Sequence, residues 1–208
     1  ITGVTADDAG LYRVRVWDDW VATYSSTAEL KIITNVVFAD PNLEEAVRAA
    51  LGIYSEPLTP EDLAGLTELY ASSTYWEISD LSGLEAAMNL EYLELDGQFT
   101  LQSLAPLTYL SHLTQLNLSG CGLDNLAFLA TLHPLLSLQV SGNFITDLSP
   151  LRAQLALEYL ALEGNELTEI SPLLDLPDLY EVYLTFNRLD TNETTAAWNV
   201  ITNLDGRG

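Results

Sequence analysis

One motif recurs along most of the chain, and it restricts the possible folds more than any other feature of the sequence. The motif is Leu-x-x-Leu-x-Leu-x-x-Asn-x-Leu/Ile, and it is most regular in residues 135–145, 157–167 and 179–189. Its six copies begin at Leu66, Leu90, Leu113, Leu135, Leu157 and Leu179. The successive spacings are 24, 23, 22, 22 and 22 residues, and a register kept over more than a hundred residues is typical of stacked repeats.

Each copy predicts a short strand followed by a turn. In the Leu-x-Leu segment the leucines point to one face of a strand and the intervening residue points to the other. Asn143, Asn165 and Asn187 follow three of the strands, and we expect them to turn inward and hydrogen-bond the backbone of the neighbouring coil. The same position holds Thr74, Gln98 and Cys121 in the first three copies. Cys121 is therefore predicted to be a buried packing residue rather than a reactive thiol.

A single copy cannot bury its leucines, so the copies are predicted to stack. The predicted fold is an α/β repeat solenoid, with a parallel β-sheet on its concave face and turns or 3-10 helices on its convex face. One inward column of side chains is expected along the sheet, made of Leu69, Leu93, Leu116, Leu138, Leu160 and Val182.

Residues 34–65 are predicted to form an N-terminal helical cap over the first repeat. Asp40 is a typical helix N-cap, Pro41 suits the first helical position and Gly52 follows the end of the helical pattern. Residues 59–62 (Thr-Pro-Glu-Asp) begin a second, shorter helix in the same way.

Residues 36–208 resemble bacterial internalin-type leucine-rich repeat proteins. The resemblance depends on the helix start at residues 40–44 (Asp-Pro-Asn-Leu-Glu), on residues 58–63 (Leu-Thr-Pro-Glu-Asp-Leu) and on the repeated Ser-Pro-Leu. It implies six leucine-rich repeats over residues 66–189 and the start of a C-terminal cap over residues 190–208. It also implies an extracellular curved solenoid that binds proteins on its concave face.

Residues 1–33 are predicted to be the C-terminal fragment of a bacterial immunoglobulin-like (Ig-like) domain, with its F and G strands. Residues 8–12 (Asp-Ala-Gly-Leu-Tyr) resemble the tyrosine corner of that family, and Val14 stands where many members have a cysteine. The expected strands cover residues 12–17 and 27–32, joined by a hairpin loop over residues 18–26. The alternative is a hairpin that extends the sheet of the solenoid. Because the chain begins Ile-Thr-Gly without Met, we expect an excerpt of a longer protein.

The composition excludes several classes of function. The chain has 30 acidic and 7 basic side chains, a net charge of −23, so a nucleic-acid partner is not expected. No apolar run approaches the about 18 residues of a membrane-spanning helix, so no membrane insertion is expected. A metal site is not expected, because His112 and His133 lie on adjacent coils without a third ligand at matching spacing. Acid–base catalysis is not expected either, because an open sheet does not enclose a pair of carboxylates. The prediction is therefore a protein that is not an enzyme and has no cofactor, metal or catalytic residue.

The strand residues that face solvent are the predicted binding site for a protein ligand. Tyrosine offers contact area and a hydroxyl group at low entropic cost, and the neighbouring acids favour a partner with a basic contact surface. The predicted binding residues are Glu68, Tyr70, Tyr92, Glu94, Asp96, Gln115, Asn117, Gln139, Tyr159, Glu163, Glu181 and Tyr183. The alternative for these residues is that they only keep the sheet soluble.

These observations predict a non-catalytic module for adhesion or recognition in a secreted or cell-surface bacterial protein. Two alternatives remain open at this point: a purely structural spacer in a long extracellular chain, and a cytosolic leucine-rich repeat scaffold. The Ig-like segment argues against the cytosolic alternative, since such domains occur mostly outside cells.

Overall fold

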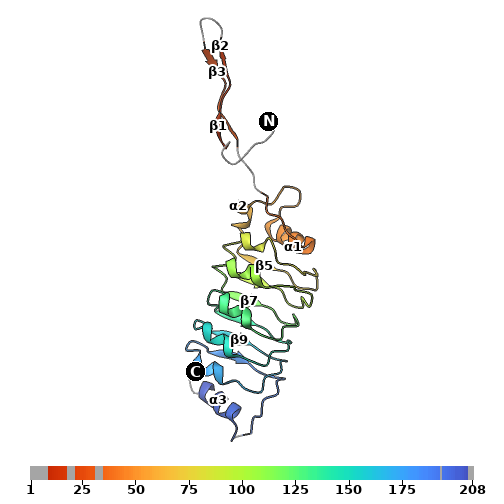
Figure 1. Cartoon of the computed structure of the whole chain (residues 1–208), viewed down its shortest axis with the longest axis vertical. Helices are drawn as coiled ribbons and strands as arrows, with labels where there is room; N and C mark the ends of the chain where they lie inside the picture. Colours follow the sequence, from red (N-terminus) through yellow and green to blue (C-terminus); the bar gives the residue numbers. More distant parts are fainter. Residues whose placement is uncertain (1–8, 18–21, 31–34, 193, 206–208) are drawn as a thin grey trace. The chain divides into compact units, whose positions relative to one another are not determined.

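The computed structural model describes residues 9–17, 22–30, 35–192 and 194–205. The chain divides into two units, Ile1–Asn35 and Val36–Gly208 (Figure 1). The buried apolar core of the described residues belongs to the second unit. None of the helices in these ranges has the length and apolar character needed to cross a membrane.

Six strands of the second unit pair in parallel, in chain order, to form one sheet. They are β5 (Glu68–Tyr70), β6 (Tyr92–Glu94), β7 (Gln115–Asn117), β8 (Ser137–Gln139), β9 (Tyr159–Ala161) and β10 (Glu181–Tyr183). The middle residues of adjacent strands are paired with one another, in the column Leu69, Leu93, Leu116, Leu138, Leu160 and Val182. The five leucines are at most 1% exposed, whereas Val182 in the last strand is half-buried. The predicted inward column and the predicted repeat solenoid are confirmed.

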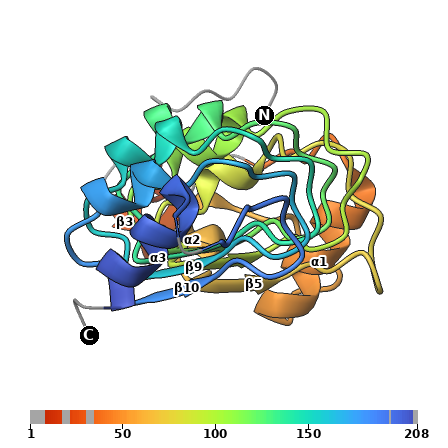
Figure 2. The same ribbon diagram turned by 90° about the horizontal axis from the view of Figure 1, so that it is seen from below.

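Five short 3-10 helices lie on the side of the stack opposite the sheet (Figure 2). They are η2 (Leu84–Ala86), η3 (Ala105–Tyr109), η4 (Ala127–Thr131), η5 (Ser149–Ala153) and η6 (Ser171–Asp175). Each of them buries one leucine, in order Leu84, Leu107, Leu129, Leu151 and Leu173. Every coil thus supplies core side chains from both sides, and adjacent coils bury them together.

Asn143 shows how consecutive coils are joined. Its Oδ1 accepts hydrogen bonds from the backbone N–H groups of Cys121 (3.0 Å) and Leu123 (2.9 Å). Its Nδ2 donates to the carbonyl oxygens of Leu118 (3.0 Å) and Val140 (2.9 Å). One buried amide therefore satisfies four backbone groups in two coils, which buried turns require.

The equivalent residues of the other repeats form either the same bridge or a different contact with the neighbouring coil. Asn165 and Asn187 form the same kind of bridge. Gln98 reaches across with its longer side chain, donating from Nε2 to the carbonyl oxygen of Ala71 (2.8 Å). Cys121 is 5% exposed, its thiol donates to the carbonyl oxygen of Leu95 (3.0 Å), and burial raises its pKa to about 11. These contacts fit a packing role for Cys121.

The expectation that Thr74 occupies the inward position is wrong. Thr74 is exposed, and its backbone N–H donates to Oγ of Ser72 (3.3 Å). The cause is the length of the first repeat, which is two residues longer than the regular 22, so that its strand is followed by a wider turn.

Two helices precede the first repeat. In α1 (Pro41–Leu51), Oδ1 of Asp40 accepts hydrogen bonds from the first turn, and Gly52 ends the helix with a φ of 70°. Oδ2 of Asp40 accepts from the N–H (2.7 Å) and hydroxyl (2.9 Å) of Ser79, which connects α1 to the first repeat. Burial raises the pKa of Asp40, but the hydrogen bonds from Ser79, Asn42 and Leu43 outweigh burial and lower it. The short helix α2 (Pro60–Leu63) starts with a capping box between Thr59 and Asp62.

At the other end, α3 (Ala196–Asp205) lies against η6. Its buried side chains are Ala197 and Val200, so one face of the helix covers apolar surface of the last repeat.

The first unit is a two-part hairpin. β1 (Gly10–Tyr12) pairs with β4 (Ala28–Leu30), and β2 (Arg15–Trp17) pairs with β3 (Ala22–Tyr24), both antiparallel. The expectation of a loop over residues 18–26 is therefore wrong for residues 22–24, and residues 18–21 lie outside the described residues. The ladder is interrupted where Val14 donates its N–H to the hydroxyl of Ser25 (2.9 Å). A side-chain acceptor there replaces a ladder bond, and the predicted strand over residues 12–17 is divided between β1 and β2.

One residue of the last repeat has a strained backbone, which leads to a testable prediction. Phe186 has a φ of 58° and is 88% exposed, and no other described residue except glycine has a positive φ. The second to fifth repeats have glycine at this position, namely Gly97, Gly120, Gly142 and Gly164. Phe186→Gly is expected to raise the free energy of unfolding by about 1 kcal/mol, because glycine adopts this conformation without strain.

The measurement is a denaturant titration followed by circular dichroism. Phe144→Gly is the control, since Phe144 is also exposed but its φ is not positive, and that change is not expected to stabilise the fold. An unfolding midpoint of Phe186→Gly at or below the wild-type value contradicts the prediction.

Candidate functional site

The sheet brings the predicted binding residues together on one open face. Their positions along the strands form two rows. The first row is Glu68, Tyr92, Gln115, Ser137, Tyr159 and Glu181, and the second is Tyr70, Glu94, Asn117, Gln139, Ala161 and Tyr183. Asp96 and Glu163 follow β6 and β9. We call this surface the concave face.

Tyrosines and carboxylates pair at the end of the concave face that comprises β5 and β6. The hydroxyl of Tyr70 donates to Oε2 of Glu68 (3.1 Å), and the hydroxyl of Tyr92 donates to Oε2 of Glu94 (2.7 Å). The two rings are tilted by 36° with their centroids 4.9 Å apart. The bond to Glu68 raises the pKa of Tyr70, and burial together with the bond to Glu94 raises the pKa of Tyr92. We call these four residues the N-terminal cluster.

A second group of the same kind lies on β9, β10 and the turn after β9. The rings of Tyr159 and Tyr183 have their centroids 5.7 Å apart, and the hydroxyl of Tyr183 donates to Oε1 of Glu181 (2.5 Å). Glu163 accepts a hydrogen bond from the hydroxyl of Ser141 (2.9 Å). Burial and the charges of Glu181 and Glu163 raise the pKa of Tyr159. We call Tyr159, Glu163, Glu181 and Tyr183 the C-terminal cluster.

The middle of the concave face is neutral. Gln115, Asn117 and Gln139 lie between the two clusters on β7 and β8. From β6 to β9 there are three interstrand steps, so the clusters are separated by about 14 Å at the usual strand spacing. The concave face is therefore two acidic aromatic clusters joined by an uncharged polar strip.

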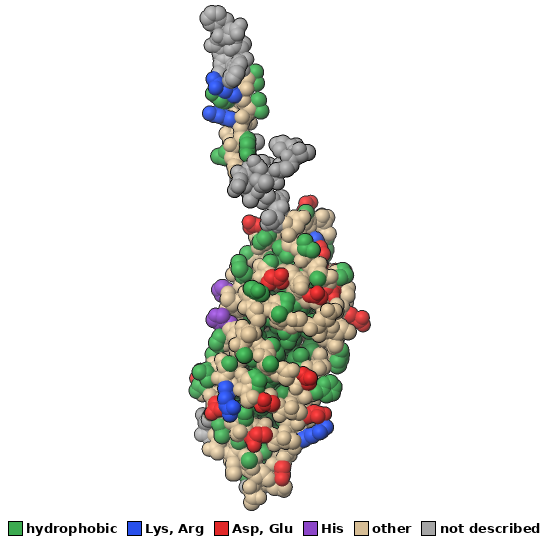
Figure 3. Space-filling model, viewed as in Figure 1, with side chains coloured by type: hydrophobic (Ala, Val, Ile, Leu, Met, Phe, Trp, Pro, Cys, Tyr) green, Lys and Arg blue, Asp and Glu red, His purple; other side chains and the backbone are tan. Residues whose placement is uncertain are grey.

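No basic side chain of the second unit neutralises these clusters within the described residues. The arginines there are Arg48, Arg152 and Arg188, and they pair with Glu44 (2.7 Å), Asp175 (2.7 Å) and Glu166 (2.9 Å). None of these pairs includes one of the twelve predicted binding residues. Acidic side chains are spread over the face shown in Figure 3, and basic ones are few.

Asp96 carries an unusual carboxylate oxygen. Its Oδ1 is buried and accepts no hydrogen bond, and among the described residues it is the one buried side-chain oxygen or nitrogen in this state. The negative charge of Asp96 contributes to the raised pKa of Tyr92 and of Cys121. A buried acceptor without a hydrogen-bond partner costs free energy.

Three further features adjoin the predicted residues, and the sequence analysis missed them. Tyr75 and Trp76 line a cavity of about 240 Å³ together with Tyr70, Ser72 and Glu94. A hollow of about 660 Å³ beside Glu181 and Tyr183 has an apolar lining that includes Leu179, Val182, Leu184, Leu189, Ile201 and Leu204. Phe186 extends the exposed aromatic surface after β10. The 24-residue spacing of the first repeat was the one signal that could have drawn attention to Tyr75 and Trp76.

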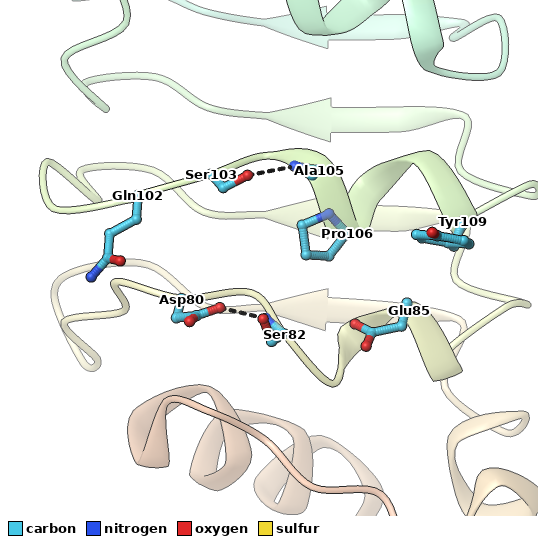
Figure 4. Close-up of a pocket in the computed structure, with 8 residues that line it drawn as sticks. All are labelled: Asp80, Ser82, Glu85, Gln102, Ser103, Ala105, Pro106 and Tyr109. Atoms are coloured by element: carbon cyan, nitrogen blue, oxygen red, sulfur yellow. Dashed lines mark hydrogen bonds between the residues drawn. The ribbon is translucent and has the colours of Figure 1, made fainter.

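A separate cavity of about 280 Å³ is lined by residues of the first two coils that lie outside the strands (Figure 4). Asp80 and Ser103 line it, but each accepts a hydrogen bond from its own turn, from the N–H groups of Ser82 (2.8 Å) and Ala105 (3.1 Å). These polar groups therefore serve the local backbone. Among the described residues no cluster of histidine, cysteine and carboxylates has the arrangement of a metal site.

Comparisons with known proteins agree with the fold. No protein-family model matches the sequence, and no curated protein matches it significantly. A leucine-rich repeat protein of Leptospira interrogans is similar in structure, with a TM-score of 0.57 and 25% identity, over 62% of this chain and 34% of that one.

Two internalins of Listeria monocytogenes are also similar. Internalin C2 has a TM-score of 0.45 and 28% identity, over 75% of this chain and 88% of its own. The internalin InlF has a TM-score of 0.46 and 23% identity, over 76% of this chain and 60% of its own. The six stacked parallel strands and the likeness to the Leptospira protein together show that this chain has a leucine-rich repeat fold, and the similar solved structures include internalins.

Proposed function

We propose that the concave face binds a protein ligand with a basic contact surface, and that the chain is a recognition module of a secreted or cell-surface bacterial protein. The observation that carries the proposal is the pair of acidic tyrosine clusters on an open sheet that contains no basic side chain of its own. The likeness to a bacterial leucine-rich repeat protein supports a non-catalytic binding role.

The chemistry of the clusters favours cationic side chains. A guanidinium or ammonium group over a tyrosine ring gains from the electron-rich face, and a carboxylate within reach adds a charge-assisted hydrogen bond. The tyrosine hydroxyls already donate to Glu68, Glu94 and Glu181, so three of the four rings are held in place before a ligand arrives. Preorganised side chains lose less entropy on binding.

The spacing of the clusters makes the proposal more specific. A ligand that uses both clusters needs cationic groups about 14 Å apart, a distance that about four residues of an extended chain span. The face is about 29 Å by 17 Å, or roughly 490 Å², compared with about 800 Å² per partner in a standard interface. We therefore expect weak binding by a single module and tighter binding when several modules act together.

Catalysis does not fit the same residues. Acid–base chemistry by two carboxylates requires an enclosed pair whose pKa values differ. Glu94 lies on the open sheet and Glu163 on the turn after β9, and they already accept hydrogen bonds from Tyr92 and Ser141. This arrangement supports recognition.

The experiment selects peptides from a displayed random library on the wild-type chain and tests them on the triple variant Tyr92→Ser, Tyr159→Ser, Tyr183→Ser. We expect the selected peptides to be rich in arginine and lysine and to lose most of their binding to the triple variant, since each lost ring removes about 0.5–2 kcal/mol of cation–π energy.

The matched control is Tyr54→Ser with Tyr109→Ser, because both tyrosines are exposed and neither lies on the concave face. A structural spacer predicts that no selected peptide depends on the three concave tyrosines, and that outcome would refute the proposal. A thermal melt confirms that each variant is folded.

A further inference from the structure

The cavity beside the N-terminal cluster has walls of an unusual composition. Tyr70, Tyr75 and Trp76 provide three aromatic side chains, and Glu94 provides the charged group, with Ser72 completing the lining. The rings of Tyr75 and Trp76 are 5.7 Å apart and inclined by 56°, so their faces differ in direction. At about 240 Å³ the cavity is smaller than the about 300–1,000 Å³ of sites for drug-sized ligands.

A two-residue insertion in the first repeat builds this wall. Ile78 lies nine residues after Leu69, whereas Ile145 lies seven residues after Leu138. The two isoleucines are nevertheless equivalent, because each donates its N–H to a buried amide oxygen of the next coil, over 2.8 Å and 3.0 Å. The longer segment in between forms the turn that carries Tyr75 and Trp76.

The turn is held in place by its own backbone. The N–H groups of Tyr75 (3.1 Å) and Trp76 (3.2 Å) both donate to the carbonyl oxygen of Ser72. The carbonyl oxygen of Trp76 accepts a hydrogen bond from Nε2 of Gln98 (2.7 Å). Trp76 packs against the core, whereas Tyr75 is 78% exposed. An aromatic side chain left this exposed on an anchored turn contributes little to the fold and is available to a ligand.

The electrostatics of the cavity favour positive charge. Glu94 lines the cavity, and no basic residue lies in the lining. A second carboxylate, that of Glu68, is close by, since it accepts a hydrogen bond from the hydroxyl of Tyr70. A hard metal ion takes six or more oxygen ligands, and one glutamate cannot supply them. An organic cation needs few oxygen ligands, because aromatic faces stabilise it through their quadrupoles.

We propose that this cavity is a binding pocket for an organic cation, namely an alkylammonium or guanidinium group. A methylated ammonium group suits it best, since such a group needs few hydrogen-bond acceptors and the walls are mostly carbon. This pocket depends on the proposed function, because Tyr70 and Glu94 belong to the concave face. It makes the pocket the site where one cationic side chain of the ligand is anchored.

The test uses small cations on the full chain and needs no protein partner. Isothermal titration calorimetry with choline is compared with 3,3-dimethylbutan-1-ol, which has the same shape without the charge. We expect saturable binding of choline and about two- to thirtyfold weaker binding of the neutral alcohol, the range that cation–π contacts supply. Tyr75→Ala and Glu94→Gln are each expected to weaken choline binding by about two- to thirtyfold.

Tyr109→Ala is the matched control, since Tyr109 is exposed on η3 and is expected to leave choline binding unchanged. Both Tyr75→Ala and Glu94→Gln are conservative for the fold, because Tyr75 is exposed and glutamine keeps an acceptor for Tyr92. Peptides that contain lysine, trimethyl-lysine or arginine then show whether the preferred cation is a primary ammonium, a quaternary ammonium or a guanidinium group.

The pocket is refuted if none of these cations binds saturably, or if choline and the neutral alcohol bind equally well. Binding that is unaffected by both Tyr75→Ala and Glu94→Gln places the cation elsewhere and also refutes it. These outcomes are independent of the peptide selection on the triple tyrosine variant, so failure of the pocket and failure of the concave face as a protein-binding surface are distinguishable.

Discussion

Replacing Leu138 by Asp is expected to unfold the repeat stack at room temperature. Leu138 is fully buried in β8, paired with Leu116 on one side and Leu160 on the other. A carboxylate there has apolar neighbours along the whole inward column, and an uncompensated buried charge costs about 3–5 kcal/mol or more. Such a loss is comparable to the about 5–15 kcal/mol of stability of a typical domain. Because each coil is stabilised by its neighbours, a defect in the middle weakens both halves.

The measurement is a thermal melt followed by far-ultraviolet circular dichroism. Gln139→Asp is the matched control, since the adjacent residue in the same strand lies on the concave face, and a surface substitution changes stability by about 0.5 kcal/mol or less. A Leu138→Asp variant that melts near the wild-type temperature would show that the column is not the core of the fold.

The second large effect is expected from Asn143→Leu, which is predicted to lower the free energy of unfolding by about 2–4 kcal/mol. The Asn143 side chain is 3% exposed and bonds to backbone groups of two coils, including the N–H of Cys121 and the carbonyl oxygen of Leu118. Leucine has a similar volume but leaves these buried groups without partners. The cost therefore comes from unsatisfied backbone atoms rather than from a cavity.

A denaturant titration measures this loss, with Asn199→Leu as the control. Asn199 is exposed on α3, so its replacement is expected to change stability little. If the two variants lose the same stability, the asparagine bridge between coils does not have the role assigned to it.

The solenoid could be predicted from the sequence because its core is periodic. Leucines at a constant spacing identify the inward residue of each strand, and their pairing in the structure follows directly. The predictions for Thr74 and for the hairpin were wrong because an insertion or a local hydrogen bond interrupts the regular pattern. Two extra residues move Thr74 out of the inward position, and a serine hydroxyl divides the hairpin at Val14. The serine leaves no periodic signal, and the two extra residues show only as the 24-residue spacing of the first repeat.

The site was predictable as a face but not as two clusters. Strand alternation places Tyr92 and Glu94 on the same side, which needs only the sequence. The contact between the rings of Tyr70 and Tyr92 is diagonal across two strands, and it depends on side-chain conformations that the strand register alone does not fix. The cavity lined by Tyr75 and Trp76 depends on a turn whose shape follows from an irregular repeat, so the regular motif contained no information about it.

The most direct test of the concave face as a binding surface is the association rate of a selected basic peptide at low and at high salt, on the wild-type chain and on the Tyr92, Tyr159 and Tyr183 triple variant. Exposed charges are screened over about 8–10 Å near physiological ionic strength. The expected result is that association to the wild-type chain slows markedly as salt rises, and that the triple variant binds weakly at every salt concentration. An association rate that does not change with salt, or a triple variant that binds as tightly as the wild type, would contradict it.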